Sequence, residues 1–324
     1  MLSYLSKKSF ELLITFFGIT LVSFFLINLT PGKPTDTLSE LNPKMTPEAR
    51  AILEKHWGLD KPVHIRYVIW LKNVSRLDFG ASLSSDMRPA WDKIRERFPI
   101  TILINSIAIF FIFLIAVPIG IHSAVKANSL SDKFTTLAVF IGFAMPTFWL
   151  ALILQFIFGV WLNILPVSGI KSLNYESLSL VQKILDSARH LCLPIFITVF
   201  GSLAGISRYM RSTMQEALSQ EYIVTARAKG LSESKVVYKH ALRNAILPVI
   251  TIVGLSIPGL ISGSVIFETI FAIPGVGQLL YQAAMSRDYN VIMAEVVMVS
   301  VLTLLGNLLA DIGYAIADPR IRVK

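Results

Sequence analysis

Long apolar stretches alternate with polar segments along this chain, and most of the apolar stretches are long enough to cross a membrane. About 20 mainly apolar residues cross the hydrocarbon core of a bilayer as an α-helix. The stretches cover residues 10–29, 100–121, 134–161, 191–206, 246–266 and 291–317, and the fourth is the shortest. The pattern therefore predicts an all-α integral membrane protein with six transmembrane helices.

Helix-breaking residues inside these stretches predict irregular spans. Pro146 lies within the third stretch and predicts a kink. Pro248 and Pro258 lie in the fifth stretch, where neighbouring helices must satisfy the freed backbone groups. The first stretch follows Lys7 and Lys8, as in a signal peptide, but it exceeds 7–15 residues and no A-x-A-like site follows. We interpret it as a retained anchor.

The polar region up to Phe98 contains two amphipathic stretches. Thr46 precedes Pro47, which predicts a helix with Thr46 as N-cap, and this helix should end at Gly58. Residues 89–98 alternate apolar and charged side chains, which predicts an interfacial helix leading into the second span.

Composition supports a membrane protein, since 54% of the 324 residues are apolar and 16% are charged. Soluble domains average about 25% charged residues. The net charge of +9 suits a nucleic-acid binder, but the basic residues lie between the apolar stretches, so membrane topology explains them and no nucleic acid is expected. One cysteine excludes an internal disulfide, and the five histidines have no metal-ligand spacing.

The distribution of Lys and Arg predicts the orientation. The loops on one side, together with both termini, carry fourteen of these residues, and the short loops on the other side carry four. Cytoplasmic loops are the ones enriched in Lys and Arg. Both termini are therefore predicted to be cytoplasmic. Arg208 and Arg211 are expected to snorkel to the inner interface.

The loop between the fourth and fifth spans has the pattern of a helix, a break and a second helix. Gly230 suits a left-handed position after the first helix, and Ser232 suits the N-cap of the second. The small residues Ala226 and Ala228 would let a partner approach closely. Two interpretations fit: a docking element for a soluble partner, or a solvated hairpin whose cations follow the charge rule.

Residues 222–248 resemble the EAA loop of ABC-importer permeases, and more closely the B-type permease subunit of the dipeptide, oligopeptide and nickel importers. The family pattern TARAKGLS…V…HALRNA…P appears as Thr225–Ser232, Val236, His240–Ala245 and Pro248. Further family motifs follow in order along the chain: Leu29–Gly32, Trp57–Pro62, Phe79–Leu83, Phe267–Phe271, Pro274–Gly277, Arg287–Tyr289 and Asp318–Arg320.

The resemblance implies a type I ABC importer permease fold in a bacterial or archaeal inner membrane. It implies residues 1–97 as anchor plus extracytoplasmic loop, 98–317 as permease core and 318–324 as cytoplasmic tail. The implied partners are a second permease, two cytoplasmic ATPases and an extracytoplasmic binding protein. No G-x-x-x-x-G-K-[ST] loop occurs, so ATP hydrolysis is expected on partner chains and no cofactor on this one.

The resemblance assigns ATPase coupling to the loop, with candidate residues Thr225, Ala226, Arg227, Ala228, Lys229, Gly230, Leu231, Ser232, His240 and Arg243. Charged groups in or near spans are costly and usually face a cavity or partner. Glu268, Glu295 and Asp311 are therefore candidates for pore lining or subunit pairing, with interfacial exposure as the alternative.

Peptides are the substrates that the resemblance favours, with nickel chelates, glutathione or another small solute as alternatives. A secondary transporter would show inverted repeats or broken half-helices in matching positions, and neither is seen. A membrane hydrolase would need a motif such as G-x-S-x-G or H-E-x-x-H, and the sequence contains neither.

Overall fold

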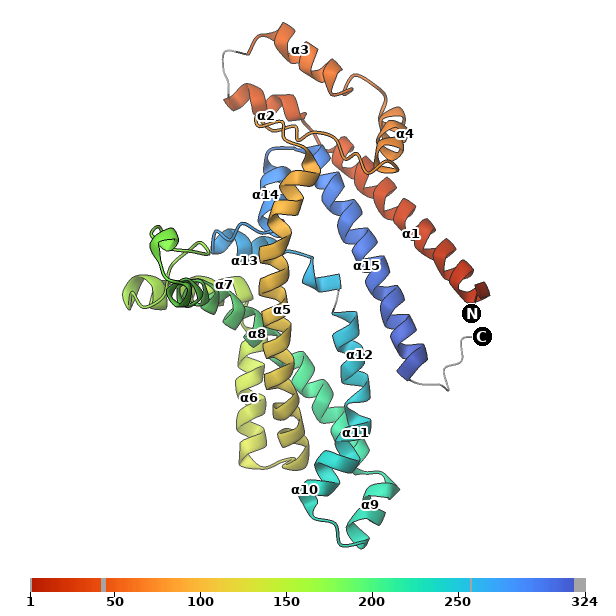
Figure 1. Cartoon of the computed structure of the whole chain (residues 1–324), viewed down its shortest axis with the longest axis vertical. Coiled ribbons are helices and arrows are strands. Elements are labelled where there is room, and N and C mark those ends of the chain that lie inside the picture. The colour runs from red at the N-terminus through yellow and green to blue at the C-terminus, as the bar shows by residue number, and fades with distance from the viewer. Residues whose placement is uncertain (1, 42–44, 257, 318–324) are drawn as a thin grey trace. The chain divides into compact units, whose positions relative to one another are not determined.

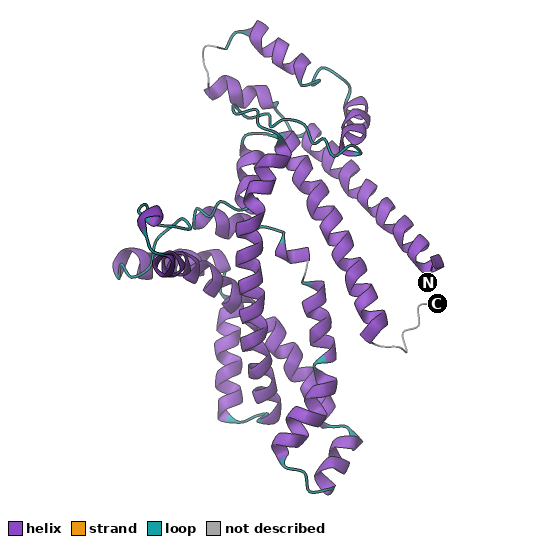
Figure 2. Ribbon diagram, in the orientation of Figure 1, coloured by secondary structure: helices purple, strands orange, loops and turns teal. Residues whose placement is uncertain are grey.

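The computed structural model of the chain describes residues 2–41, 45–256 and 258–317. The described residues are mainly helical (Figures 1 and 2), and Ala81 pairs with Pro89 in an isolated β-bridge. The predicted tail, residues 318–324, lies outside the described residues. The chain divides into two compact units: residues 1–101, 261–265 and 274–324 form the first, and residues 102–260 and 266–273 form the second.

Four continuous helices are long and apolar enough to cross a membrane. They are Phe10–Leu29 within α1 (Leu2–Leu29), α5 (Ala90–Val125), α8 (Leu180–Leu218) and Tyr289–Leu308 within α15 (Tyr289–Ala317). Two bent pairs raise the number to six if each is one span: Leu130–Ala144 with Thr147–Trp161, and Glu233–Ala245 with Leu247–Leu255. The all-helical membrane architecture is thus confirmed, with four to six candidate spans.

In the first unit, α1 packs against α15 and against α4 (Val63–Val74). Phe24 of α1, Trp70 of α4 and Val291 of α15 belong to one buried apolar cluster. A hydrogen bond of 3.1 Å between the hydroxyls of Thr20 and Tyr67 joins α1 to α4. One side of the apolar first stretch therefore packs on the core of this unit, while most of its residues are exposed.

The predicted amphipathic helix in the polar region is confirmed as α3 (Pro47–His56). Thr46 Oγ1 accepts the backbone N–H of Ala49 at 3.2 Å, which caps the first turn. Gly58 follows the helix with φ +67°, a left-handed conformation that favours glycine. The signals for the start and end of this helix were both local.

Glu54 connects α3 to α2 (Pro34–Leu41) and the turn before it. Its carboxylate accepts Lys33 Nζ at 2.5 Å, Thr35 Oγ1 at 2.9 Å and Arg50 Nε at 3.0 Å. The hydrogen bond from Lys33 is the main reason why the pKa of Glu54 falls to about 2. Glu54 is therefore charged at neutral pH and holds the two helices together.

In the second unit, α6 (Leu130–Ala144) and α7 (Thr147–Leu154) both pack against α8. The predicted kink at Pro146 is confirmed as a bend of 95° between the two helices. Gly120 of α5 allows close packing on α8, because a Cβ there would lie 2.7 Å from the carbonyl oxygen of Ser207. The second unit thus contains a tight crossing between α5 and α8.

The helix predicted at residues 89–98, leading into the second span, is confirmed as the first part of α5, which continues from Ala90 through Pro99. Two other predictions about helix boundaries were wrong. The short fourth span is part of α8, because a capping box of Ser179 and Gln182 starts that helix within the polar stretch. The fifth span is interrupted after α12 (Leu247–Leu255), and the region that breaks it contains Pro258.

Arg211, which is predicted to snorkel to the inner interface, forms an ion pair, and its position relative to a membrane stays a prediction. Its Nη2 lies 2.8 Å from Oδ2 of Asp132, whose side chain is almost fully buried. The pair joins α8 to the first turn of α6. The guanidinium of Arg208 lies 5.4 Å from the centre of the Phe140 ring, a cation–π distance.

Candidate functional site

The predicted helix, break and helix between α8 and α12 is confirmed, and we call residues 221–245 the elbow. It begins with α9 (Glu221–Ala228), turns, and continues through α10 (Glu233–Lys235), the π-helical segment η3 (Val236–Ala241) and α11 (Leu242–Ala245). Figure 1 shows α9 and α10 joined by a loop at one end of the second unit. A wide π-helical turn is uncommon and often marks a functional segment.

Gly230 ends α9 in the way that the sequence predicted. Its φ is +75°, its N–H donates to Arg227 O at 2.9 Å, and the N–H of Leu231 donates to Ala226 O at 3.4 Å. This is the Schellman arrangement, in which a left-handed residue after the helix satisfies its last carbonyls. A Cβ on Gly230 would meet nothing within 4 Å. Backbone conformation, rather than space, is therefore what requires glycine here.

The inner face of the elbow packs against α8 and makes the turn rigid. Ile223 and Ala226 of α9 share a buried cluster with Val236 and Val237 of η3 and with Met210 and Met214 of α8. Ala226 is 5% exposed, so its small size serves this packing and does not open a surface to a partner, contrary to the prediction for that residue. Leu231 is half-buried against the same cluster.

The outer face of the elbow holds most of the other predicted coupling residues. Thr225, Ala228, Lys229, Ser232 and Arg243 are all exposed, and His240 is half-buried within η3. Ser232 occupies the N-cap position of α10 in extended conformation, without a side-chain capping bond. The face is therefore a mixture of small, hydroxyl and basic side chains on a fixed backbone.

Three exposed apolar or aromatic side chains on this face were missed in the sequence. Val224 and Tyr238 are each 62% exposed, and Tyr222 is 38% exposed. Their signal was available, because Tyr222 and Val224 flank Ile223, which with Ala226 forms the buried i, i+3 row of α9. Exposed apolar side chains on a rigid element are typical of a contact surface for another protein.

Arg227 acts within the elbow. Its guanidinium makes two parallel bonds to Glu233, with Nη2–Oε1 at 2.6 Å and Nε–Oε2 at 3.1 Å, and so bridges the turn from α9 to α10. Such bidentate pairs fix geometry as well as adding energy. The exposed cations that remain for a partner are Lys229, Lys235, Lys239 and Arg243.

The acidic residues predicted in or near spans are not at the surface where they are described. Glu268 of α13 (Val265–Ile270) is 5% exposed and Glu295 of α15 is 3% exposed. Asp311 lies in α15, but its side chain is outside the described residues. Their roles in pore lining or subunit pairing remain predictions. Within the described part of the chain, no group of three His, Cys, Asp or Glu is placed to hold a metal ion.

The first unit brings together three sequence motifs that lie far apart in the chain. Arg287 donates a hydrogen bond to the carbonyl of Pro31, and the hydroxyl of Tyr289 donates to Gly32 O at 3.2 Å. Asp288 accepts the hydroxyl of Ser82, and Asn290 Nδ2 donates to Ala81 O at 2.7 Å. The start of α15 is therefore the anchor for both the end of α1 and the loop after α4.

The chain matches known families of membrane transport proteins over nearly its whole length. Residues 116–323 match the family described as binding-protein-dependent transport system inner membrane component, and residues 1–108 match the N-terminal region described for such membrane components. In solved structures, a chain of the inward-facing MetNI methionine ABC transporter is similar with a TM-score of 0.51 and 19% identity. That likeness covers 70% of this chain and 98% of the other, and concerns the fold alone.

Similar curated proteins extend over nearly the full chain. The oligopeptide transport system permease protein AppB of Bacillus subtilis is 41% identical, covering 99% of each chain. The di/tripeptide permease protein DppB of Pseudomonas aeruginosa is 38% identical over 99% of each, and DppB of Escherichia coli is 34% identical over 100% of each. The chain thus belongs to the family of binding-protein-dependent transport system inner membrane components, as a multi-pass transport subunit without a catalytic role that works with a binding protein and an ATPase.

Proposed function

We propose that this chain is a permease subunit of a peptide importer and forms, with a second permease, the path for di- or oligopeptides. The observation that supports it most is the full-length identity of 41% to a protein named as an oligopeptide permease. The di/tripeptide and dipeptide permeases at 38% and 34% identity support the same substrate class. Nickel chelates, glutathione and other solutes are the alternatives.

Uptake by cells tests the substrate class directly. In the cell that encodes this chain, deleting its gene should abolish uptake of labelled di- and tripeptides, and a plasmid copy should restore it. Uptake of nickel chelates and of glutathione should not change. Loss of nickel or glutathione uptake with peptide uptake intact would establish the alternative substrate. Uptake that survives ATP depletion but stops when the proton gradient collapses would indicate a secondary transporter.

The elbow is the proposed contact with the cytoplasmic ATPases, of which two are expected per importer. Its inner face is fixed to α8 by a buried cluster, and its outer face offers exposed apolar side chains and cations. A rigid helical element of this kind suits insertion into a groove of a soluble partner. Thr225, Ala228 and Lys229 form the part of the proposed contact nearest to the turn at Gly230.

Because the elbow is connected directly to α8, it would act as a mechanical link between the ATPase and the membrane helices. The elbow follows α8 directly, and α8 is a continuous helix of 39 residues. Movement of an ATPase at the elbow would therefore tilt α8 as a lever, together with α6 and α7, which pack on it. Rigid-body tilting of packed helices is an established way to switch between two states. We propose that this switch exposes the path to each side of the membrane in turn.

The proposed orientation places both termini and the elbow in the cytoplasm, and residues 30–98 outside. In a chain with Cys192→Ala, a cysteine replacing Ser85 should react with a membrane-impermeant maleimide in intact cells, whereas one replacing Ser234 should react only after lysis. Ser85 and Ser234 are both exposed, so access through the membrane decides the result. The reverse labelling pattern would invert the topology.

A further inference from the structure

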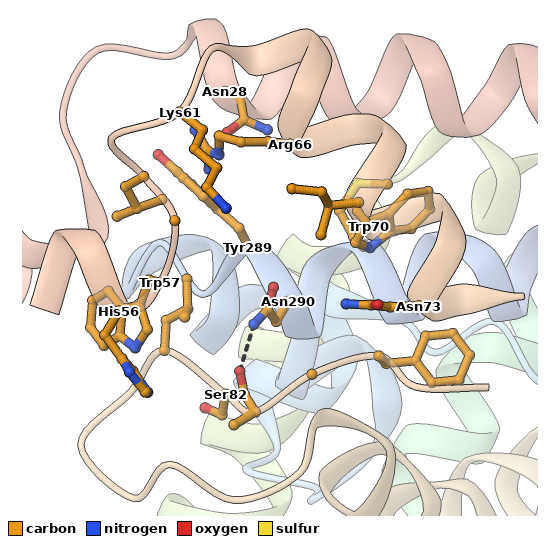
Figure 3. A pocket seen from close by; sticks show the side chains of 18 of the residues that line it. Asn28, His56, Trp57, Lys61, Arg66, Trp70, Asn73, Ser82, Tyr289 and Asn290 are labelled. Atoms are coloured by element: carbon orange, nitrogen blue, oxygen red, sulfur yellow. Dashed lines mark hydrogen bonds between the residues drawn. The ribbon is translucent and has the colours of Figure 1, made fainter. Parts of the chain in front are cut away.

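A cavity of about 430 Å³ lies within the first unit, in the proposed outer region (Figure 3). Its walls come from the end of α1, the turn after α3, α4, the loop that follows α4, and the start of α15. Small-molecule sites usually enclose about 300–1,000 Å³. The cavity therefore has room for a ligand the size of a short peptide.

Two polar atoms of the cavity lining have no hydrogen-bond partner. Trp70 is 8% exposed, and its indole Nε1 donates to nothing in the described structure. Asn28 Oδ1 also has no partner, although Asn28 Nδ2 donates to Phe24 O at 2.8 Å. A buried indole N–H normally finds an acceptor. Two residues of the lining thus carry a buried donor and a buried acceptor that the described residues leave unpaired.

The charge of the lining is positive. Arg66, Lys61 and Lys55 line the cavity, and the ion pairs of the described residues include none of the three. Arg66 is half-buried, and burial lowers its pKa. The acidic residue of the described lining, Asp78, accepts the N–H of Gly80 at 2.9 Å. A half-buried cation without a counter-charge is costly, and an anionic ligand would offset that cost.

Aromatic rings complete the lining. Trp57 is half-buried, Phe79 is 7% exposed, and Tyr289 reaches the cavity from α15. Figure 3 shows Lys61, Arg66 and Asn28 gathered on one side and Ser82 and Asn290 on the other. Aromatic faces bury apolar groups effectively. The lining therefore matches a carboxylate joined to an apolar or aromatic side chain.

We propose that this cavity binds short peptides through a free C-terminal carboxylate. Arg66 faces the carboxylate, and the aromatic rings hold the C-terminal side chain. This proposal rests on the proposed peptide transport, because it makes the cargo the ligand. A carboxylate side chain of the binding protein could occupy the same cavity, so the experiment must distinguish binding of a peptide from docking of that side chain.

Direct binding to the assembled importer, without its binding protein, tests the cavity. With the complex in lipid nanodiscs, equilibrium dialysis should detect labelled Ala-Phe and at least tenfold weaker binding of Ala-Phe amide, which lacks the carboxylate. Arg66→Gln should weaken Ala-Phe binding about tenfold or more, in line with the loss of a charged hydrogen bond. Arg76→Gln is the matched control, since Arg76 is exposed and outside the lining, and it should change nothing.

Three results would overturn the proposal. Equal binding of the acid and the amide to the unmodified complex would do so even if a variant failed to assemble. Unchanged binding in an assembled Arg66→Gln complex would do so as well. Absence of Ala-Phe binding, with weaker docking of the binding protein to the Arg66→Gln complex, would assign the cavity to an acidic side chain of that protein.

Uptake by cells separates this proposal from the proposed function. If the importer takes up peptides but the cavity binds none, the cavity proposal fails and peptide transport stands. If deletion of the gene leaves peptide uptake unchanged, peptide transport fails regardless of the dialysis. Because Ala-Phe and its amide are defined probes, the dialysis tests the cavity whether or not the importer transports peptides.

Discussion

Replacing Gly230 by valine should reduce peptide uptake and substrate-stimulated ATP hydrolysis together, by roughly tenfold. At φ +75° a β-branched side chain is strongly disfavoured, and such strain costs about 1–3 kcal/mol. The turn would leave this conformation, and the two hydrogen bonds that end α9 would break with it. Because the turn sets the angle between α9 and α10, the proposed contact with the ATPase would lose its shape.

Two further variants separate coupling from folding. Gly230→Asn should retain most of the activity, because asparagine tolerates the left-handed region and a Cβ here meets nothing within 4 Å. Ala228→Trp should reduce coupling by blocking the exposed outer face. Ala226→Trp is unsuitable as a surface probe, since Ala226 is buried in the elbow. Near-normal uptake by a Gly230→Val importer that is expressed normally would show that the elbow is a solvated hairpin.

Local signals explain what could be predicted about the elbow. The left-handed position of Gly230 and the start of α10 after Ser232 depend on residues within a few positions of one another, so the sequence was sufficient. The burial of Ala226 depends on contacts with η3 and α8, which lie before and after it in the chain. Ala226 was grouped with other small residues without regard to which face of α9 each one occupies, and that face decides whether a residue is buried.

The membrane helices show the same division between local and distant causes. Hydropathy placed the apolar stretches correctly, and Pro146 marked a real bend. Elsewhere proline does not end a helix, because α5 continues through Pro99 and α8 contains Pro194. Whether a helix tolerates proline depends on neighbours that satisfy the freed carbonyl. The start of α8 had a local signal in the capping box of Ser179 and Gln182, but the continuation of these two helices through their prolines is tertiary information that the pattern lacks.

The long-range contacts at the start of α15 were the feature of the fold that the sequence predicted least well. Resemblance identified Arg287–Tyr289 as a motif but gave it no structural role. Its contacts reach back more than 200 positions, to Pro31 and to the loop that contains Ser82. An aspartate before an apolar stretch does predict a helix N-cap, and this signal was available at Asp288. Its second role, as the acceptor for the loop after α4, required the structure.

Asp288→Ala should lower the stability of the first unit substantially. Asp288 is 2% exposed and accepts the hydroxyl of Ser82, Leu83 N at 3.0 Å and Val291 N at 3.3 Å. Loss of the N-cap costs about 1 kcal/mol, and each buried donor left without a partner costs about 1–3 kcal/mol. The apparent melting temperature of the purified chain in detergent should therefore fall by several degrees.

Limited proteolysis should locate the same loss. With Asp288 replaced, the loop after α4 loses its main acceptor, so trypsin should cleave faster at Arg76 and Arg88, which flank the loop and are exposed. Asp60→Ala is the matched control, because Asp60 is an exposed aspartate of the same region and should leave both measurements unchanged. If Asp288→Ala melts and is cleaved like the unmodified chain, the carboxylate does not hold the loop. Faster cleavage with an unchanged melting temperature would mean that it holds the loop alone, and that α15 packs on α1 without its cap.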